Sequence, residues 1–144
     1  MCFALREQTA INVRKMNKIV MISGSRSIKD ISPGLESITK IMELEFSIIL
    51  GDAPGVDKLV QEYLRSQNYP NVKVYFALWS GNGKPRNVTG FGTVGVPGSY
   101  VDRDKMMCSI CHYGLALWDG ASRGTRDNID RTGRKTKIIR IRGT

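Results

Sequence analysis

Short apolar runs alternate along this chain with segments that carry hydrophobic residues at helical spacing. Short apolar runs predict five strands, at 18–22, 46–50, 71–77, 113–118 and 137–141. Those at 18–22, 46–50 and 113–118 have the continuous pattern of strands buried in the sheet. The clearest helix lies between the second and third of the five strands, and its apolar positions fall at i, i+3, i+4, i+7 and i+8: Val56, Leu59, Val60, Tyr63 and Leu64. Its polar positions, including Asp57 and Gln61, are expected to point outward.

Three further helices are expected between the other strands. One begins with Ser32 as N-cap and Pro33 at the first helical position, one covers 100–111, and one covers 122–132 and is closed by Gly133. Strands that alternate with helices are typical of an α/β fold. We expect a single Rossmann-like domain over 16–144 with a parallel five-stranded sheet and helices on both faces, after an extension of unknown role at 1–15.

The segment 79–99 has neither a helical nor a strand period. It holds six glycines and two prolines in 21 residues, and loops of this length inside a domain are more often functional than accidental. We expect a loop that closes over a ligand or is disordered without one. Trp79, Phe91 and Tyr100 are candidates for stacking on a base there, although strand-end aromatic residues more often belong to the core.

Composition places the chain among ordinary globular proteins. It has 144 residues, of which 41% are hydrophobic and 24% charged, and no apolar run approaches the ~20 residues of a bilayer span. The first 15 residues lack the apolar stretch of a signal peptide, so a cytoplasmic location is expected. The three cysteines, Cys2, Cys108 and Cys111, are too few for a disulfide framework and are interpreted as reduced thiols.

Two of the cysteines lie in a motif that resembles a haem-attachment site. Residues 108–112, CSICH, match the haem-attachment pattern C-x-x-C-H, but they run from a predicted helix directly into a buried strand. His112 is the sole histidine, so a zinc site would also lack ligands. Small thiols packed against the sheet are the simpler interpretation, and no metal or other cofactor is expected.

Positive charge is concentrated at the end of the chain. The net charge is +9, and residues 123–144 contribute +6 of it through eight Lys or Arg and two Asp. This distribution favours an anionic partner, either a small molecule or a nucleic acid, although a solvated face would also explain it.

Three strand-to-helix turns are rich in small residues: 23–27 (SGSRS), 51–57 (GDAPGVD) and 118–127 (WDGASRGTRD). Each follows a predicted parallel strand, so all three are expected at one edge of the sheet, where ligands of such sheets bind. Glycine lets backbone N–H groups approach a phosphate closely. Ser25, Ser122 and Thr125 add hydroxyl groups and Arg26 adds a charged fork. The turns therefore predict a shared anion site.

The usual phosphate-binding fingerprints, G-x-G-x-x-G with an acidic partner and G-x-x-x-x-G-K-[ST], are missing from the sequence. With the three turns taken together, the chain resembles the SLOG superfamily of Rossmann-like proteins, and within it the small YspA/YpsA-related proteins. The matching stretches are ISGSR, GDAPGVDKLVQEYL, RDKMM and YGLALWDGASRGTRDNI. More distant likenesses are the lonely-guy phosphoribohydrolases and DNA-processing protein A.

The resemblance implies a nucleotide-derived ligand, such as a nucleoside phosphate or an ADP-ribose or NAD derivative, and a homodimer. It also implies the ligand-binding residues: Gly24, Ser25, Arg26, Gly51, Asp52, Gly55, Asp57, Arg103, Asp119, Gly120, Ser122, Gly124 and Thr125. Arg103 matches an arginine that follows the variable loop, but Asp104 stands where many relatives have Asn.

Catalysis is a separate question. Cleavage of a nucleotide's N-glycosidic bond calls for a carboxylate near the ribose, and Asn128 occupies the position of the phosphoribohydrolases' glutamate. Asp52, Asp57 and Asp119 remain as possible acids, each with a structural alternative at a helix or turn. We expect a protein that senses or sequesters its ligand. The alternatives are an N-glycosidase or phosphoribohydrolase acting on nucleoside monophosphates, and a protein that binds single-stranded nucleic acid.

Overall fold

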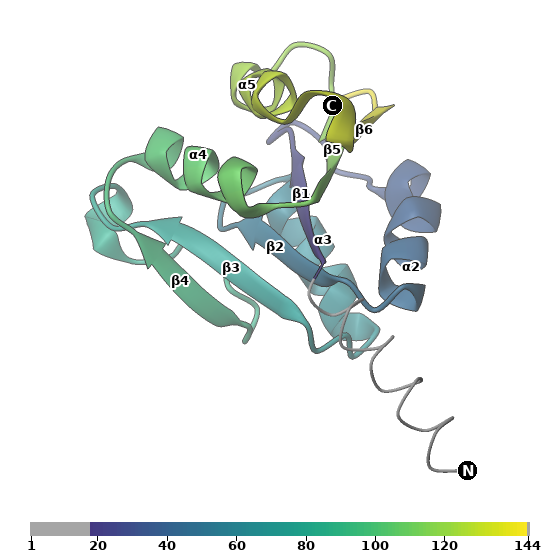
Figure 1. The fold of residues 1–144 in the computed structure, drawn as a ribbon, viewed down its shortest axis with the longest axis horizontal. Coiled ribbons are helices and arrows are strands. Elements are labelled where there is room, and N and C mark those ends of the chain that lie inside the picture. Colours follow the sequence, from purple (N-terminus) through teal and green to yellow (C-terminus); the bar gives the residue numbers. More distant parts are fainter. Residues whose placement is uncertain (1–17, 144) are drawn as a thin grey trace.

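One parallel sheet forms the centre of the structure, a computed structural model in which residues 18–143 are described. The strands are β1 (Ile19–Gly24), β2 (Ser47–Gly51), β3 (Val72–Ala77), β4 (Gly92–Val96), β5 (Tyr113–Trp118) and β6 (Thr136–Arg140). Their order is β4-β3-β2-β1-β5-β6, and every neighbouring pair is parallel. The chain therefore winds outward from β1 to β4 and returns to the other side of β1 (Figure 1).

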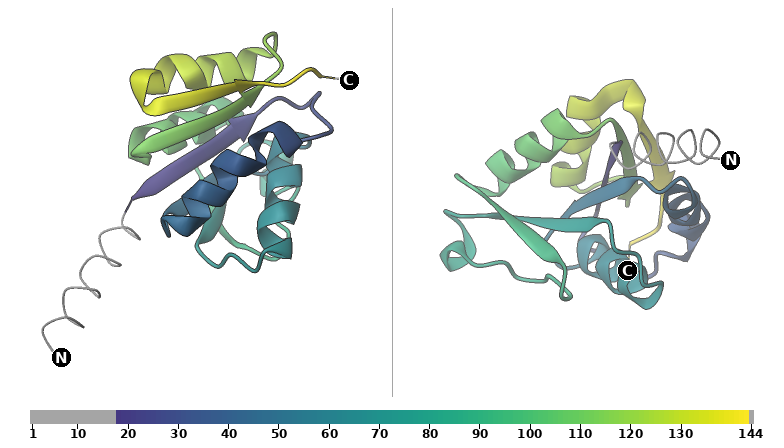
Figure 2. Two further views of the ribbon diagram at one scale, coloured as in Figure 1. Left: turned by 90° about the vertical axis from the view of Figure 1, so that its right-hand side faces the viewer. Right: turned by 60° about the horizontal axis from the view of Figure 1, so that its bottom comes forward.

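Helices cover both faces of the sheet. The four α-helices of the described residues are α2 (Leu35–Glu43), α3 (Val56–Ser66), α4 (Tyr100–Ile110) and α5 (Arg123–Thr132). Figure 2 shows α2 and α3 on one side and α4 and α5 on the other. None of the helices between residues 18 and 143 has the length and hydrophobicity that a membrane span requires.

Side chains on the strands alternate between two hydrophobic clusters, as the pleat of a sheet dictates. Val20 and Ile22 of β1 pack with α2 and α3, whereas Met21, between them, packs with Met107 and Cys108 of α4. Each face of the sheet thus has its own core. The continuous apolar runs at 18–22, 46–50 and 113–118 predicted this two-sided burial, and the structure confirms it for β1, β2 and β5. At the edge of the sheet, β6 has no buried residue.

The sheet has six strands, so the prediction of five was wrong. The additional strand, β4, lies inside the segment that was expected to be an irregular loop. It pairs with β3 at the edge of the sheet, and only Val96 of its five residues is buried. Two glycines and this exposure hide the alternation that normally predicts a strand.

The connection from β3 to β4, residues 78–91, includes the first part of that segment and crosses the face where α3 lies. The carbonyl group of Asn87 accepts a hydrogen bond from Gln61 Nε2 of α3 (3.0 Å), and Thr89 Oγ1 donates one to Gln61 Oε1 (2.8 Å). Gln61 is therefore buried, as is Asp57, and the prediction that both point outward was wrong. Residues 78–91 have no helical or strand period, so the sequence did not predict that they cover this side of α3.

The start of the first crossover also differs from the prediction. Ser32 begins a short 3-10 helix (Ser32–Gly34) rather than capping an α-helix, and its N–H and hydroxyl groups both donate to Asp30. Pro33 lies in the first turn of this element. The extension at 1–15 lies outside the described residues.

Candidate functional site

The three small-residue turns meet at one cavity of about 440 Å³ beyond the carboxyl ends of β1, β2 and β5. This is where the winding of the sheet reverses, between β1 and β5. Ten of the thirteen predicted site residues line the cavity: Gly24, Ser25, Arg26, Gly51, Asp57, Arg103, Asp119, Ser122, Gly124 and Thr125. The structure thus brings together side chains that are up to about a hundred residues apart in the sequence.

Ser25 connects the first turn to the other two. Its backbone carbonyl group accepts a hydrogen bond from the N–H of Val56 (3.3 Å), at the start of α3. Its hydroxyl oxygen accepts one from the N–H of Asp119 (3.0 Å) and lies 2.6 Å from Ser122 Oγ. Ser25 is only 1% exposed, so this one buried residue fixes the relative position of all three turns.

Gly55 allows the first two turns to lie backbone against backbone. Its φ is +82°, and a Cβ atom there would lie 2.5 Å from the Cα of Arg26. Gly24 is similarly enclosed, since its Cβ would meet the carbonyl oxygen of Leu117 at 2.5 Å. These two glycines therefore leave room for other parts of the chain itself. Gly124, by contrast, has no atom within 4 Å of its Cβ position and lines the cavity.

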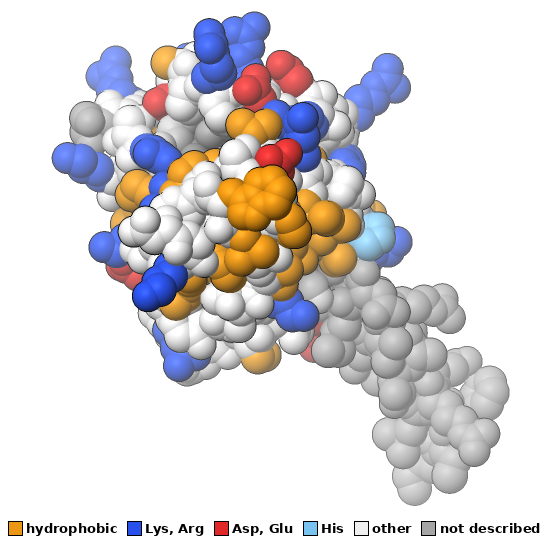
Figure 3. Space-filling view, turned by 90° about the vertical axis from the view of Figure 1, so that its left-hand side faces the viewer, with side chains coloured by type: hydrophobic (Ala, Val, Ile, Leu, Met, Phe, Trp, Pro, Cys, Tyr) orange, Lys and Arg blue, Asp and Glu red, His pale blue; other side chains and the backbone are white. Residues whose placement is uncertain are grey.

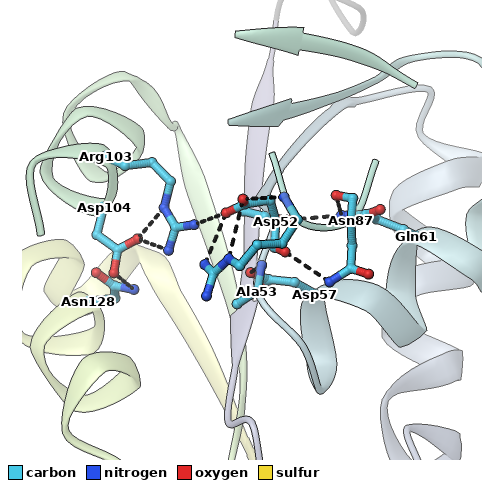
Figure 4. Close-up of polar contacts among 10 residues, drawn as sticks. Asp52, Ala53, Asp57, Gln61, Asn87, Arg103, Asp104 and Asn128 are labelled. Carbon is cyan, nitrogen blue, oxygen red and sulfur yellow. Dashed lines mark hydrogen bonds and ion pairs between the residues drawn. The ribbon is translucent and has the colours of Figure 1, made fainter. Parts of the chain in front are cut away.

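Arg103 of α4 lies among three carboxylates on one wall of the cavity (Figure 4). Its Nη1 contacts Asp52 Oδ1 at 2.5 Å, and its Nε and Nη2 both contact Asp104 Oδ1 at 3.0 Å. Burial acts to lower the pKa of Arg103, but Asp104, Asp57 and Asp52 outweigh it and raise that pKa. Arg103 is therefore a fixed cation whose N–H groups are largely used within the protein.

Asp52 holds this arrangement from outside the cavity. It is 1% exposed and binds Arg86 as well, through the Arg86 backbone N–H (2.8 Å) and Nη2 (3.1 Å). Burial acts to raise its pKa, but the hydrogen bonds and charges of Arg86 and Arg103 prevail, so its pKa lies below the usual value. Asp52 thus anchors both Arg103 and the 78–91 connection, and it is not among the cavity-lining residues.

Asp57 is the carboxylate with the most unusual environment. It lies in the first turn of α3, lines the cavity and accepts a hydrogen bond from the N–H of Ala53 (3.2 Å). Burial raises its pKa to about 7, and the charges of Asp104 and Asp52 act in the same direction, against the attraction of Arg103. Near neutral pH this side chain exchanges a proton at the cavity wall.

Asp119 has the structural role that its position in a turn suggested. Its Oδ1 accepts the N–H groups of Ala121 (2.8 Å) and Ser122 (2.7 Å), and its Oδ2 accepts the hydroxyl of Ser27 (2.7 Å). These hydrogen bonds lower its pKa well below the usual range. Asp119 shapes the third turn as an ionised side chain.

The N-terminus of α5 is open toward the cavity. Its N-cap residue, Ser122, makes no side-chain capping hydrogen bond, because its hydroxyl group faces Ser25 instead. Gly124 and Thr125, in the first turn, both line the cavity. The helix dipole therefore presents its positive end to this space, the geometry that favours a bound anion. Arg26, also on the cavity wall, forms no ion pair with any described carboxylate.

Several cavity residues were not among the predicted site residues. Asp104 and Met107 of α4 line it along with Arg103, and together with Tyr100, expected only as a stacking candidate, they fall at the i, i+4 and i+7 spacing of one helix face. Asn128 of α5 also lines it, and its Nδ2 lies 3.3 Å from Asp104 Oδ2. The helical spacing of the α4 residues relative to Arg103 is the sequence feature from which these additional cavity residues could have been predicted.

Of the three aromatic residues proposed to stack on a base, one lines the cavity. Tyr100 lines the cavity, with the guanidinium of Arg86 4.1 Å from its ring centre. Phe91 packs against the core beneath Arg65. Trp79 is 78% exposed and is not among the cavity-lining residues, nor is any other residue of 79–99. Figure 3 shows hydrophobic side chains gathered on the side of the molecule where β4 and α4 lie.

The CSICH motif has a structural role. Cys108 and Cys111 are buried thiols against the sheet that are not joined in a disulfide, and burial raises the pKa of Cys108 to about 11. His112 Nδ1 accepts a hydrogen bond from the N–H of Ile19 (2.9 Å). Among residues 18–143 no group of three His, Cys, Asp or Glu side chains is placed to hold a metal.

The fold and the site define an α/β protein with a cavity at the switch point of a parallel sheet, lined by charged, hydroxyl and apolar side chains. The chain matches no family model, and no curated protein or solved structure shows significant similarity to it.

Proposed function

We propose that this protein binds a nucleotide-derived ligand through a phosphate group at the N-terminus of α5. The observation that carries the proposal is the convergence of three turns on one cavity, with the open helix N-terminus and Arg26 on its walls. The likeness of the turns to those of the Rossmann-like SLOG superfamily supports the same ligand class, and it supports a homodimer as the assembly.

The position of Gly124 offers a sharp test. Gly124 lines the cavity and a Cβ there meets no atom within 4 Å, so a small side chain is accommodated at the cavity wall without disturbing the fold. Gly124→Asp places a negative charge beside the phosphate position, while Gly124→Ala adds a single methyl group. An acidic residue in the first turn of a helix is also favourable for helix stability.

The experiment is calorimetric titration of the wild type and both variants with AMP, together with mass spectrometry of any small molecule that copurifies. We expect Gly124→Asp to weaken AMP binding by at least about tenfold through repulsion, and Gly124→Ala to weaken it much less. Wild-type protein that binds neither AMP nor a copurifying nucleotide contradicts the proposal, as does equal affinity of the wild type and Gly124→Asp.

A second candidate function, hydrolysis of a nucleoside monophosphate, is favoured by one observation. Asp57 lines the cavity and titrates near neutral pH, as a general acid requires, although Asn128 replaces the expected glutamate. In this reaction the N-glycosidic bond breaks as water adds to C1′ of the ribose, the acid's proton passes to the departing base, and the proton that the water loses restores the acid. Chromatography of nucleoside monophosphates incubated with the protein measures the free base. Turnover that Asp57→Asn abolishes selects the enzyme, and lack of release selects the binding protein.

A further inference from the structure

A second concave surface adjoins the cavity. This groove has a volume of about 780 Å³, and its walls come from the first turn, the third turn, the end of β6 and the residues that follow β6: Ser27, Asp119, Ala121, Arg140, Ile141, Arg142 and Gly143. Ser27 and Asp119 line the cavity as well. A single ligand can therefore extend from the cavity into the groove past these two residues.

Arg140 is held in place over the third turn. Its guanidinium carbon lies 5.6 Å from the ring centre of Trp118, and a Cβ at Gly120 would collide with its Nη2. Gly120, at φ +83°, was expected to face a phosphate, but the space beside it is occupied by this guanidinium. Because Gly120 has no side chain, the guanidinium of Arg140 fits beside it at the edge of the groove.

Within residues 18–143, no carboxylate neutralises either arginine of the groove. Among the described residues, no Asp or Glu lies within ion-pair distance of Arg140 or Arg142. The acidic residue of the groove, Asp119, already accepts hydrogen bonds from Ser27, Ala121 and Ser122. Arg103, in the cavity, differs because it is paired with Asp52 and Asp104.

We propose that the groove is a second anion subsite, in which Arg140 and Arg142 bind a phosphate group beyond the one in the cavity. The inference rests on the proposed function and narrows its ligand to a nucleotide derivative with at least two phosphates. Guanidinium groups suit this task because they donate two parallel hydrogen bonds to a phosphate. The Arg140 side chain is already held against Trp118 and Gly120, so less of its conformational entropy is lost when a ligand binds.

The test compares AMP, which has one phosphate, with ADP-ribose, which has two, by calorimetric titration of the wild type, Arg140→Gln and Arg142→Gln. The matched control is Arg134→Gln, which removes the same charge in the 3-10 helix Gly133–Lys135 before β6, away from the groove. We expect the wild type to bind ADP-ribose at least about tenfold more tightly than AMP. Arg140→Gln and Arg142→Gln should lose this preference and keep their AMP affinity, and Arg134→Gln should keep both.

Since Arg140 packs on Trp118, the melting temperature of each variant is measured first, and Arg142→Gln carries the test if Arg140→Gln is unfolded. AMP binding without any preference for ADP-ribose refutes the second subsite and leaves the proposed function intact. Binding of neither compound refutes both. A ten-residue oligothymidylate that binds more tightly than ADP-ribose, with an affinity that falls steeply with salt and depends on the same arginines, assigns the groove to nucleic acid and overturns the inference.

Discussion

Replacing Asp57 by Asn changes how the stability of this protein depends on pH. The carboxyl of Asp57 has a native pKa of about 7 against an ordinary value of 3.8, because burial disfavours its charge. The unfolded state therefore gives up its proton well below the pH at which the native state does. The stability contributed by this group is complete below about pH 4 and is lost as the pH rises to about 7.

The size of the effect follows from the pKa difference. A rise of about three units corresponds to about 4 kcal/mol, at 1.36 kcal/mol per unit. Asn has nearly the same shape, retains an oxygen that accepts the Ala53 N–H, and does not titrate. Asp57→Asn should thus gain stability relative to the wild type between pH 4 and pH 7, by up to about 4 kcal/mol, and the gain should then level off.

The assay is urea unfolding followed by far-UV circular dichroism, at half-unit steps from pH 4.5 to 8.5. Asp52 and Asp119 have pKa values below the usual 3.8, so both stay ionised across this pH range and do not produce the expected pH-dependent difference. Asp130→Asn, on the exposed side of α5, is the matched control and should not follow the same curve. A wild-type-to-Asp57→Asn difference that is independent of pH, or that shrinks as pH rises, refutes the reasoning.

Three other variants test how the site is built. Ser25→Ala removes the acceptor of the Asp119 N–H and should destabilise the protein by about 1–3 kcal/mol in urea unfolding, whereas alanine at the exposed Ser109 should cost far less. Gly55→Ala should cost about 3 kcal/mol or more because of its positive φ and the contact with Arg26, whereas Gly92→Ala, which meets no atom within 4 Å, should be nearly neutral. In a Cys2→Ser background the two remaining thiols should react with Ellman's reagent at pH 8 only as fast as the protein unfolds, and rapid modification of the folded protein would show that they are accessible.

Much of the site follows from one property of parallel sheets. Their strands end at a common edge, so three apolar runs that each lead into a small-residue turn place those turns close together. Ser25, Ser122 and Thr125 could be assigned to one site for this reason, and the structure brings them to one cavity. The strong helical period of α3 likewise predicted its apolar face correctly.

What the sequence did not reveal depends on contacts between distant segments. Asp52 belongs to the same motif as Gly51 and Asp57, but its carboxylate turns away to Arg86, which is 34 residues later in an aperiodic segment. In the sequence, Gly120 resembles a glycine that faces a phosphate. In the structure, the guanidinium of Arg140, from the neighbouring strand β6, lies over it. A local pattern shows that a small residue is needed at such positions, and only the fold shows which atoms require the space.

The most direct test of the central claim is a titration of ¹⁵N-labelled protein with AMP, followed in amide correlation spectra. Three segments that are far apart in sequence but form one cavity predict that the amide signals of Ser25, Ala53 and Gly124 move together and yield one dissociation constant. Signals that move in one turn only, or that move chiefly on α2 at the distant side of the sheet, would contradict the account.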